Sequence, residues 1–580
     1  MSMPRSEHPR PQFQREDWIN LNGTWTFEFD FGKSGLAAGW SASKGFGRNI
    51  VVPFCPESRL SGVGHTDFID AMWYHRRIDI PAGWQGRDVL LHFGGVDYES
   101  EVFIDGKSVG RHFGGQAGFS HDITALVRPG GSHHLVVRVH DDTRRGNQPR
   151  GKQCDHLKSS GCLYTRATGI WQTVWLEAVC PWGLKDVHIV PDLDAARFIV
   201  MPSFRRLKRG FIFRATLKDG NDAIAEAQAP AAQCGPVILP VKNPRPWSTP
   251  DPHLYDLTLE VLENAKVIDR VSSYAGLRKI HIEGNRIYLN NKRLYLRLVL
   301  DQGFYPEGIW TAPTDESLRG DIELSMKAGF NGARLHQKVF EERFHYWADK
   351  LGYLTWGESA SWGIDPNNPL AARNFLAEWR EVVHRDRNHP SIIAWTPFNE
   401  TCHVTDASQH SRVHIDAYEI CKAIDPTRPV NDSSGYVHWR TDLWTVHNYD
   451  QDPSKLKEML TPSPENGVWR NIPKWDAEYA GQPYLVDEYG GIKWNPQDLG
   501  TSQTSWGYGQ SPKSLDEFYE RLAALTDVLL SLDHVSGYCY TQLTDIEQEQ
   551  NGIYFYDRGE KFDMARIHAI FGRKPPWAEI

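Results

Sequence analysis

The sequence of 580 residues lacks the patterns that mark membrane, secreted and disulfide-bonded proteins. Residues 1–5 contain no apolar run of the kind that a secretory signal needs, so we expect no signal peptide. No stretch of about 18 apolar residues occurs, which predicts no membrane-spanning helix and no membrane partner. The eight cysteines are scattered and form no Cys-x-x-Cys pair, which favours reduced thiols. We therefore expect a cytoplasmic protein.

Several binding and catalytic motifs are also absent. The net charge is -9 and no basic run occurs, so no nucleic-acid partner is predicted. There is no His-Glu-x-x-His motif, and His384 and His389 are five residues apart, which argues against a zinc site. No Gly-x-Ser-x-Gly elbow occurs, and no glycine-rich stretch lies between a strand and a helix pattern. The sequence predicts neither a metal nor a cofactor.

What the chain has in quantity is aromatic residues, with 22 Trp, and short apolar runs. Between about residues 17 and 180 these runs alternate with polar residues and are separated by Gly, Pro and Asp-Gly turns, which predicts a β-sandwich. Residues 181–277 form a second strand-rich block whose size fits an immunoglobulin-like β-sandwich. We predict three domains, with bounds 1–180, 181–277 and 278–580.

The third block alternates strand and helix patterns. A (β/α)8 barrel needs eight strands in roughly 300 residues, and this block supplies that number. Helical periodicity is expected over Ala371–Asn388, where Phe375, Trp379 and Val383 share one face, and around Leu318, Ile322 and Met326. The connection after the fifth strand carries the weakest helical pattern. The predicted strands are Leu294–Leu300, Gly332–Leu335, Tyr353–Trp356, Ile392–Thr396, Pro429–Asn431, Leu443–His447, Tyr484–Val486 and Val535–Thr541.

Two glutamates stand directly after apolar strands. Glu400 follows the fourth predicted strand and Glu488 follows the seventh. In a (β/α)8 barrel the chemistry lies at the carboxyl ends of the strands, so we expect Glu400 and Glu488 to face each other. A pair of carboxyl groups suits cleavage of a glycosidic bond, because one group protonates the leaving oxygen while the other attacks the anomeric carbon or activates water.

Other polar residues follow the barrel strands and would ring the same end of the barrel. Arg334 would neutralise a nearby carboxylate, which favours Glu488 as the nucleophile, and Tyr449 would hydrogen-bond the same carboxylate. Donors and carboxylates around a barrel mouth indicate a hydroxyl-rich substrate. The residues in these positions are Asp301, Gln302, Arg334, His336, Glu358, His447, Asn448, Tyr449, Gln542 and Asp545.

Taken with their surrounding motifs, these residues make the chain resemble glycoside hydrolase family 2. The motifs are Leu21–Trp25, Thr168–Glu177, Asn388–Ile392, Phe398–Glu400 and Thr541–Gly552. The resemblance implies a jelly-roll sugar-binding domain, an immunoglobulin-like domain and a catalytic barrel that retains the anomeric configuration. It implies Glu400 as acid/base and Glu488 as nucleophile, with Arg334, Asn399, His447 and Tyr449 in support; His336 and Trp356 are looser matches.

One departure bears on the sugar. Glucuronidases of the family carry an Asn-x-Lys near the end of the barrel, and none is found there. Asn290-Asn291-Lys292 precedes the first strand, although Lys493 or Arg558 could supply a cation. We predict an exo-acting β-glycosidase, with β-galactosides first and α-L-arabinopyranosides, β-glucuronides and β-mannosides as alternatives. An inverting or endo-acting enzyme, a non-catalytic carbohydrate-binding protein and a homo-oligomer stay open.

Overall fold

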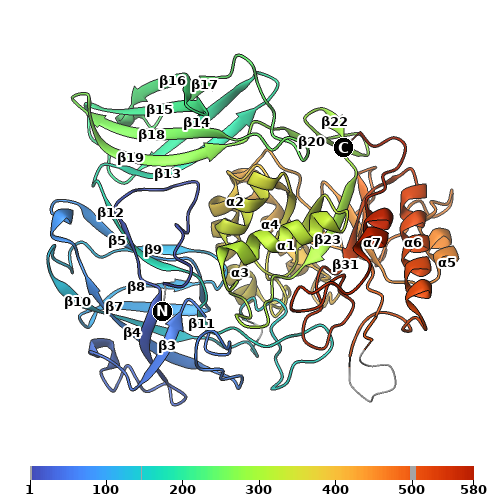
Figure 1. The fold of residues 1–580 in the computed structure, drawn as a ribbon, viewed down its shortest axis with the longest axis horizontal. Coiled ribbons are helices and arrows are strands. Elements are labelled where there is room, and N and C mark those ends of the chain that lie inside the picture. The colour runs from blue at the N-terminus through green and yellow to red at the C-terminus, as the bar shows by residue number, and fades with distance from the viewer. Residues whose placement is uncertain (1–2, 146, 497–504, 580) are drawn as a thin grey trace.

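The computed structural model describes residues 3–145, 147–496 and 505–579, which form two β-rich parts and one α/β part (Figure 1). The first part is a sandwich of a four-stranded sheet, β1-β12-β5-β9, and a six-stranded sheet, β3-β2-β4-β10-β7-β8. Alternate residues of β2, among them Trp25 and Phe27, point into a shared apolar core. The strands are β1 (Trp18–Asn20), β2 (Gly23–Phe29), β3 (Arg48–Val52), β4 (Ala71–Asp79), β5 (Asp88–Phe93), β6 (Val96–Asp97), β7 (Glu99–Ile104), β8 (Lys107–Phe113), β9 (Phe119–Asp122), β10 (Ser132–His140), β11 (Gly169–Ile170) and β12 (Val174–Val179).

The second part is the smaller sandwich at the top left of Figure 1. Its sheets are β13-β14-β17 and β16-β15-β18-β19. Along β15 the residues alternate between buried and half-buried, with Phe211, Phe213 and Leu217 in the core, as expected for a sheet with one covered face. The strands are β13 (Leu184–Asp192), β14 (Arg197–Phe204), β15 (Phe211–Asp219), β16 (Asp222–Pro230), β17 (Val237–Pro240), β18 (Tyr255–Glu263) and β19 (Lys266–Ala275).

The third part holds a curled parallel sheet of seven strands in the order β26-β25-β24-β23-β31-β30-β29, which confirms the predicted fold class. The predicted fifth strand is reduced to one bridge between Val430 and Trp395, followed by the pair β27-β28. No helix lies between β28 and β29 in this described stretch. The barrel strands are β23 (Leu296–Asp301), β24 (Gly332–Leu335), β25 (Leu354–Glu358), β26 (Ile392–Thr396), β27 (Phe398–Asn399), β28 (Ser433–Ser434), β29 (Trp444–Asn448), β30 (Tyr484–Gly490) and β31 (Val535–Thr541).

The helices of this part cover the outside of the sheet (Figure 1). Helix α3 begins after Asn368, whose side chain accepts from Leu370 N, and Pro369 takes the first helical position. Its buried face contains Phe375, Trp379 and Val383, as predicted. The helices are α1 (Asp315–Lys327), α2 (Glu342–Leu351), α3 (Pro369–Asp386), α4 (Ala407–Ile424), α5 (Pro453–Leu460), α6 (Leu515–Ser531) and α7 (Met564–Phe571).

The prediction for α1 was partly wrong. Leu318 and Ile322 are buried, but Met326 is 37% exposed. The buried stripe instead includes Asp321, whose carboxylate is paired with Arg558. The buried face of α1 thus includes an ion pair that the apolar pattern did not indicate.

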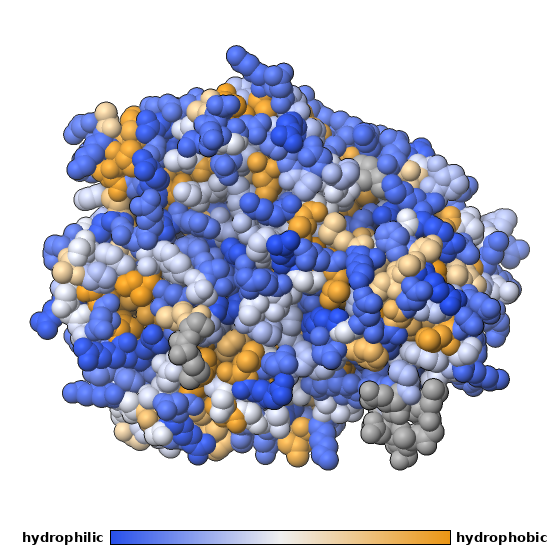
Figure 2. Space-filling view, in the orientation of Figure 1, coloured by the Kyte–Doolittle hydropathy of each residue, from blue (hydrophilic) through white to orange (hydrophobic). Residues whose placement is uncertain are grey.

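The three parts pack against one another through polar as well as apolar contacts. Arg15, in the segment before β1, binds Asp269 of β19 at 2.9 Å and lies 3.3 Å from Glu177 of β12. Glu378 of α3 accepts from Gln116 N of the large sandwich at 2.6 Å. None of the helices in the described ranges is long and apolar enough to cross a membrane. The face in Figure 2 is mostly hydrophilic, with small and separate hydrophobic patches.

Candidate active site

Glu400 stands immediately after β27, at the carboxyl end of the barrel sheet. Its backbone has a φ of 51°, in the left-handed region that side chains other than glycine rarely adopt. The backbone N of Glu400 donates to Ser434 O at 3.0 Å, which continues the pairing of β27 with β28. The side chain is 22% exposed, and its Oε1 lies 2.8 Å from His447 Nδ1. This carboxylate is therefore held from one side and open on the other.

Glu488 lies within β30 and is enclosed more tightly. Its side chain is 6% exposed; Oε1 accepts from Arg334 and Oε2 accepts from the hydroxyl of Tyr449. The register of β30 shifts against β31 between Val486 and Tyr489. Such a bulge lets two successive side chains serve one side of the sheet, and Asp487 and Glu488 both approach His447.

His447 of β29 is the link between the two glutamates. Burial alone would lower the pKa of His447, but the adjacent carboxylates of Glu488 and Asp487 raise it to about 10. The ring is thus an imidazolium at neutral pH. One nitrogen of His447, one oxygen of Glu400 and one oxygen of Glu488 all lie within 4.8 Å of one another. The two carboxylates therefore share one small space.

The same cation affects Glu400. Burial alone would raise the pKa of the Glu400 carboxyl group, but the hydrogen bond with His447 and the cations of Lys152 and Arg334 outweigh burial and lower it. The Glu400 carboxyl group is consequently ionised at neutral pH.

Arg334 of β24 is fully buried and donates hydrogen bonds to two carboxylates and one side-chain amide. Besides Glu488, it donates to Glu358 at 3.0 Å and to the side-chain oxygen of Asn399 at 3.2 Å. Burial raises the pKa of Glu358 to about 7, against the effect of Arg334. The Nδ2 atom of Asn399 is buried without a partner among the described residues, so it can donate to a bound molecule.

The structure brings most of the predicted site residues together. Arg334, His336, Asn399, His447 and Tyr449 surround Glu400 and Glu488.

Gln542 lies in an adjoining network that involves two neighbouring side chains. It accepts from Gln302 at 2.5 Å and donates to Asn551 at 2.9 Å. The predicted polar ring therefore continues beyond the two glutamates.

Two predicted residues do not join this group. Trp356 is fully buried, its ring lies in an apolar cluster, and its Nε1 donates to Thr396 at 2.6 Å. It is a core residue, and Trp362 is the tryptophan at the site. Asp301 accepts from Gly303 N at 2.9 Å, and burial raises its pKa to about 7. Its neighbours include Asp321 rather than the two glutamates.

Sequence reasoning missed several residues of the site. Lys152 and Tyr164 belong to residues 141–168 of the large sandwich, the teal segment that runs toward the barrel in Figure 1. The Tyr164 hydroxyl donates to Glu549 and accepts from Gln302. No motif near Lys152 or Tyr164 in the sequence indicates that these residues reach the barrel. Asp487 adjoins Glu488, but only the bulge shows that it faces the site.

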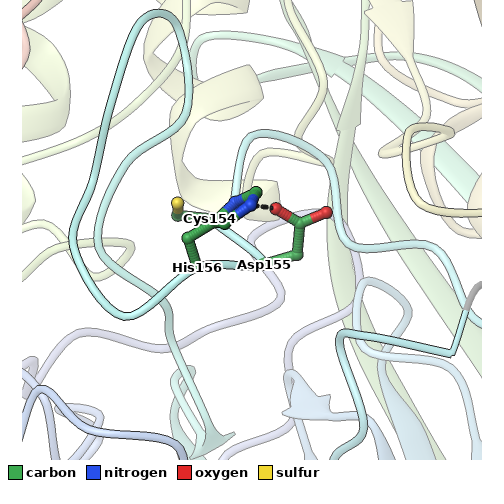
Figure 3. Close-up of side chains that lie close together, drawn as sticks. All are labelled: Cys154, Asp155 and His156. Atoms are coloured by element: carbon green, nitrogen blue, oxygen red, sulfur yellow. Dashed lines mark ion pairs between the residues drawn. The ribbon is translucent and has the colours of Figure 1, made fainter.

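Two clusters in the described ranges gather three potential metal ligands each. One is Glu400, His447 and Glu488, in which the imidazolium of His447 has no lone pair for a metal. The other is Cys154, Asp155 and His156 in the sandwich segment, shown in Figure 3. There the Asp155 carboxylate is 2.7 Å from His156. The expectation of no metal stays a prediction.

Two of the three carboxylate-binding positions suggested by the sequence lie away from the glutamates. Asn290-Asn291-Lys292 lies at the turn between β21 (Arg286–Leu289) and β22 (Lys292–Arg293), where Asn290 donates to Trp247 O at 2.9 Å. Arg558 is committed to Asp321 at 3.0 Å. Neither contacts the glutamates.

Comparison with known sequences matches all three parts to one family. Residues 64–161 match the sugar binding domain of glycosyl hydrolases family 2, residues 184–278 match the middle domain, and residues 280–561 match the TIM barrel domain.

Several curated proteins are similar to the chain. It is 23% identical to a beta-galactosidase of Thermoanaerobacter pseudethanolicus over 77% of this chain and 56% of that protein. It is 27% identical to a beta-glucuronidase of Bacteroides fragilis over 75% of this chain and 64% of that protein. A beta-glucuronidase of Paenibacillus borealis is 24% identical over 81% and 82%. The chain thus spans between half and two thirds of the first two.

A solved structure of a b-glucuronidase from Ruminococcus gnavus, bound to an N1-substituted uronic isofagomine, has the same fold. The TM-score is 0.80 at 20% sequence identity, and the match covers 98% of this chain and 100% of that one.

Proposed function

The chain belongs to glycoside hydrolase family 2, and on that premise we propose that it is an exo-acting β-glycosidase that retains the anomeric configuration. The observation that carries the proposal is the approach of an oxygen of Glu400 to within 4.8 Å of an oxygen of Glu488. Carboxyl groups of retaining enzymes lie about 5–5.5 Å apart, whereas inverting enzymes need ~6.5–9.5 Å to admit a water molecule. The short separation favours retention.

The reaction would proceed in two displacements. Glu488 attacks the anomeric carbon, the bond from that carbon to the aglycone oxygen breaks, and Glu400 gives its proton to the departing oxygen. Glu400 then takes a proton from water, the water oxygen attacks the anomeric carbon, and the ester to Glu488 breaks. At the end of the cycle Glu488 is a free carboxylate and Glu400 again carries a proton.

The surroundings support this division of roles. Glu488 is fixed by Arg334 and Tyr449, and these two donors orient the carboxylate for attack. Among the described residues, His447 is the one charged hydrogen-bonding partner of the Glu400 carboxylate, and Glu400 is more exposed, so a leaving group can reach it. Since the acid must be protonated and the pKa of Glu400 is lowered, we expect activity on the acidic side of neutrality.

The sugar is a finer question. β-Galactosides, our first choice from the sequence, are supported by the name of the Thermoanaerobacter relative. β-Glucuronides are supported equally by the Bacteroides and Paenibacillus relatives. α-L-Arabinopyranosides share the ring stereochemistry of galactose and belong in the same test.

The experiment is hydrolysis of 4-nitrophenyl β-galactoside, β-glucuronide, β-mannoside, β-glucoside and α-L-arabinopyranoside, with the first-formed anomer of the best substrate followed by proton NMR. The proposal expects release of the sugar in its starting configuration, followed by slow mutarotation. Release of the opposite anomer would establish an inverting enzyme. No hydrolysis, together with saturable sugar binding, would establish the non-catalytic alternative.

A further inference from the structure

Lys152 is a buried cation whose ammonium group has no hydrogen-bonding acceptor among the described residues. Only 6% of the residue is exposed. Its Nζ lies 3.8 Å from the centre of the Trp362 ring. In the described ranges, this ring is the one side chain with which Nζ forms a hydrogen bond, ion pair or cation–π contact. A cation on an aromatic face still has N–H donors on the side away from the ring.

Lys152 lies close to the proposed chemistry. Trp362, which supports it, donates from Nε1 to Asn399 O at 3.2 Å, directly beside Glu400. The charge of Lys152 acts on both Glu400 and Glu488 and, after burial, is the largest influence lowering the pKa of His336. Burial would lower the pKa of Lys152 itself, but Cys162 and the nearby carboxylates raise it, so the side chain stays charged.

The backbone around Lys152 is fixed to the barrel on one side. Arg150 N donates to Trp362 O at 2.7 Å, and Gly151 N donates to Ala360 O at 3.2 Å. Gly151 has a φ of +57°, and a Cβ there would lie 2.2 Å from Gln337 O, so only glycine allows this approach.

On the other side the segment is fixed to its own sandwich by Gln153, which donates to Asp97 of β6 at 2.7 Å. Within the segment, Tyr164 N donates to Lys152 O at 2.8 Å. These contacts hold Lys152 in place before any ligand binds, so less conformational entropy is lost when a ligand binds to it.

The other cations of this region are already engaged. Arg334 binds Glu358 and Glu488, Lys338 donates to the carbonyls of Gly303 and Trp310, and Lys561 binds Asp545. Arg558 is bound to Asp321. Among the described residues, Lys152 is thus a cation near the two glutamates that has no hydrogen-bonded or ion-paired anion of its own.

We propose that Lys152, delivered by the large sandwich to the barrel mouth, binds the carboxylate of a terminal uronic acid and so selects acidic over neutral β-glycosides. This inference rests on the proposed glycosidase function and names its substrate class. A neutral sugar would leave a buried ammonium group without an acceptor, which costs free energy, whereas a carboxylate would satisfy it with a charge-assisted bond.

The test uses matched pairs of substrates that differ only at C6: 4-nitrophenyl β-D-glucuronide against β-D-glucoside, and β-D-galacturonide against β-D-galactoside. We expect kcat/KM to favour the acidic member of at least one pair. Lys152→Met should remove about 10- to 100-fold of kcat/KM for that acidic substrate relative to its neutral partner, the scale of one hydrogen bond to a charged group. The acidic-to-neutral ratio is the readout, because Lys152 also acts on the pKa of Glu400 and so affects both substrates. Lys152→Arg should recover part of the loss.

Two further variants serve as controls. Lys158→Met removes the same charge from an exposed position of the same segment and should leave the acidic-to-neutral ratio unchanged. Lys493→Met removes the rival cation named from the sequence. Loss of the ratio in Lys493→Met but not in Lys152→Met would overturn the proposal.

Other outcomes separate this inference from the proposed function. A wild-type preference for neutral sugars, or an equal loss on both members of a pair in Lys152→Met, would overturn the role of Lys152 while leaving a glycosidase. Preference for a 6-sulfated galactoside over the galacturonide would also overturn it, because the anion bound by Lys152 would then be a sulfate. If no substrate is hydrolysed, binding decides: free D-glucuronate should raise the melting temperature of the wild type and not of Lys152→Met, and equal shifts would overturn the proposal.

Discussion

The surroundings of Glu400 and Glu488 differ although both residues end strands of one barrel. Glu488 is 6% exposed and accepts hydrogen bonds from an arginine and a tyrosine, whereas Glu400 is 22% exposed and is paired with one histidine. Under the proposed mechanism the enclosed carboxylate attacks, and the open one exchanges protons with a leaving group and with water. The two roles would then be assigned by the surroundings of two identical side chains.

Removing the enclosed carboxylate should have the largest effect. Glu488→Gln keeps the size of the side chain but cannot form the ester, so kcat should fall by about 10⁴-fold or more on every active substrate. Steady-state rates beside the wild type measure this, with circular dichroism as a control for folding. Activity within 10-fold of the wild type would remove Glu488 from the nucleophile role.

Removing the open carboxylate should cost less. Glu400→Gln should lower kcat by about 10²- to 10⁴-fold, the range for loss of general acid–base catalysis. The first step should suffer much less with 2,4-dinitrophenyl glycosides, because that leaving group needs no proton. A loss that is equal for good and poor leaving groups in pre-steady-state bursts would contradict the acid role.

Rescue of glycine variants by azide would distinguish the roles of the two glutamates. In Glu488→Gly, azide would attack the anomeric carbon directly and give a glycosyl azide of inverted configuration. In Glu400→Gly, azide would attack the ester on Glu488 and give the retained configuration. Identifying both products by NMR assigns the two roles in one experiment, and an exchange of the two configurations would reverse them.

A smaller effect is expected from one donor to Glu488. Tyr449→Phe deletes the hydroxyl that donates to Oε2 and leaves the ring, which stacks on Tyr508 with centroids 3.4 Å apart. One hydrogen bond to a charged group corresponds to about 10- to 100-fold in kcat/KM. A change in melting temperature without this kinetic loss would show that the hydroxyl serves only packing.

The smallest effect should be a shift of the pH profile. His447→Gln removes the hydrogen bond that lowers the pKa of Glu400, so the alkaline limb of kcat/KM, which reports the free enzyme, should move to higher pH. In the wild type the pKa of His447 is raised to about 10, so the stability that its charge contributes is complete below pH 6.5 and is lost as the pH rises through about 10. Thermal melts of both proteins between pH 6 and 10.5 should therefore converge at the alkaline end.

The sequence located the two glutamates because their signal is local: an apolar strand followed by a carboxylate. It was less reliable where a distant residue decides the outcome. The predicted fifth strand keeps a single bridge to Trp395, and on its other side the backbone of Val430 bonds to Asp442, through N–H to carboxylate at 2.9 Å and carbonyl to N–H at 2.8 Å. Met326 is exposed because the buried face of α1 runs through Leu318, Asp321, Ile322 and Ser325, and Asp321 is held there by Arg558, more than 230 residues away.

The site shows the same limit. Period-two alternation places Asp487 and Glu488 on opposite faces of a regular strand, and only the bulge in β30 brings both to His447. Lys152 and Tyr164 lie in another domain, at a sequence distance over which no periodic pattern carries information. The site residues that follow barrel strands could thus be predicted from the sequence. The residues that the large sandwich adds to the same site could not.

The anchored segment around Gly151 has a consequence for how such an enzyme can change. Under the two proposals, the reaction depends on barrel residues and recognition depends on Lys152 of the large sandwich, so substitutions in the segment can change the preferred sugar while Glu400 and Glu488 stay in place. Exchange of this segment, with its glycine and lysine, between two members of the family would show whether the two properties can be changed separately.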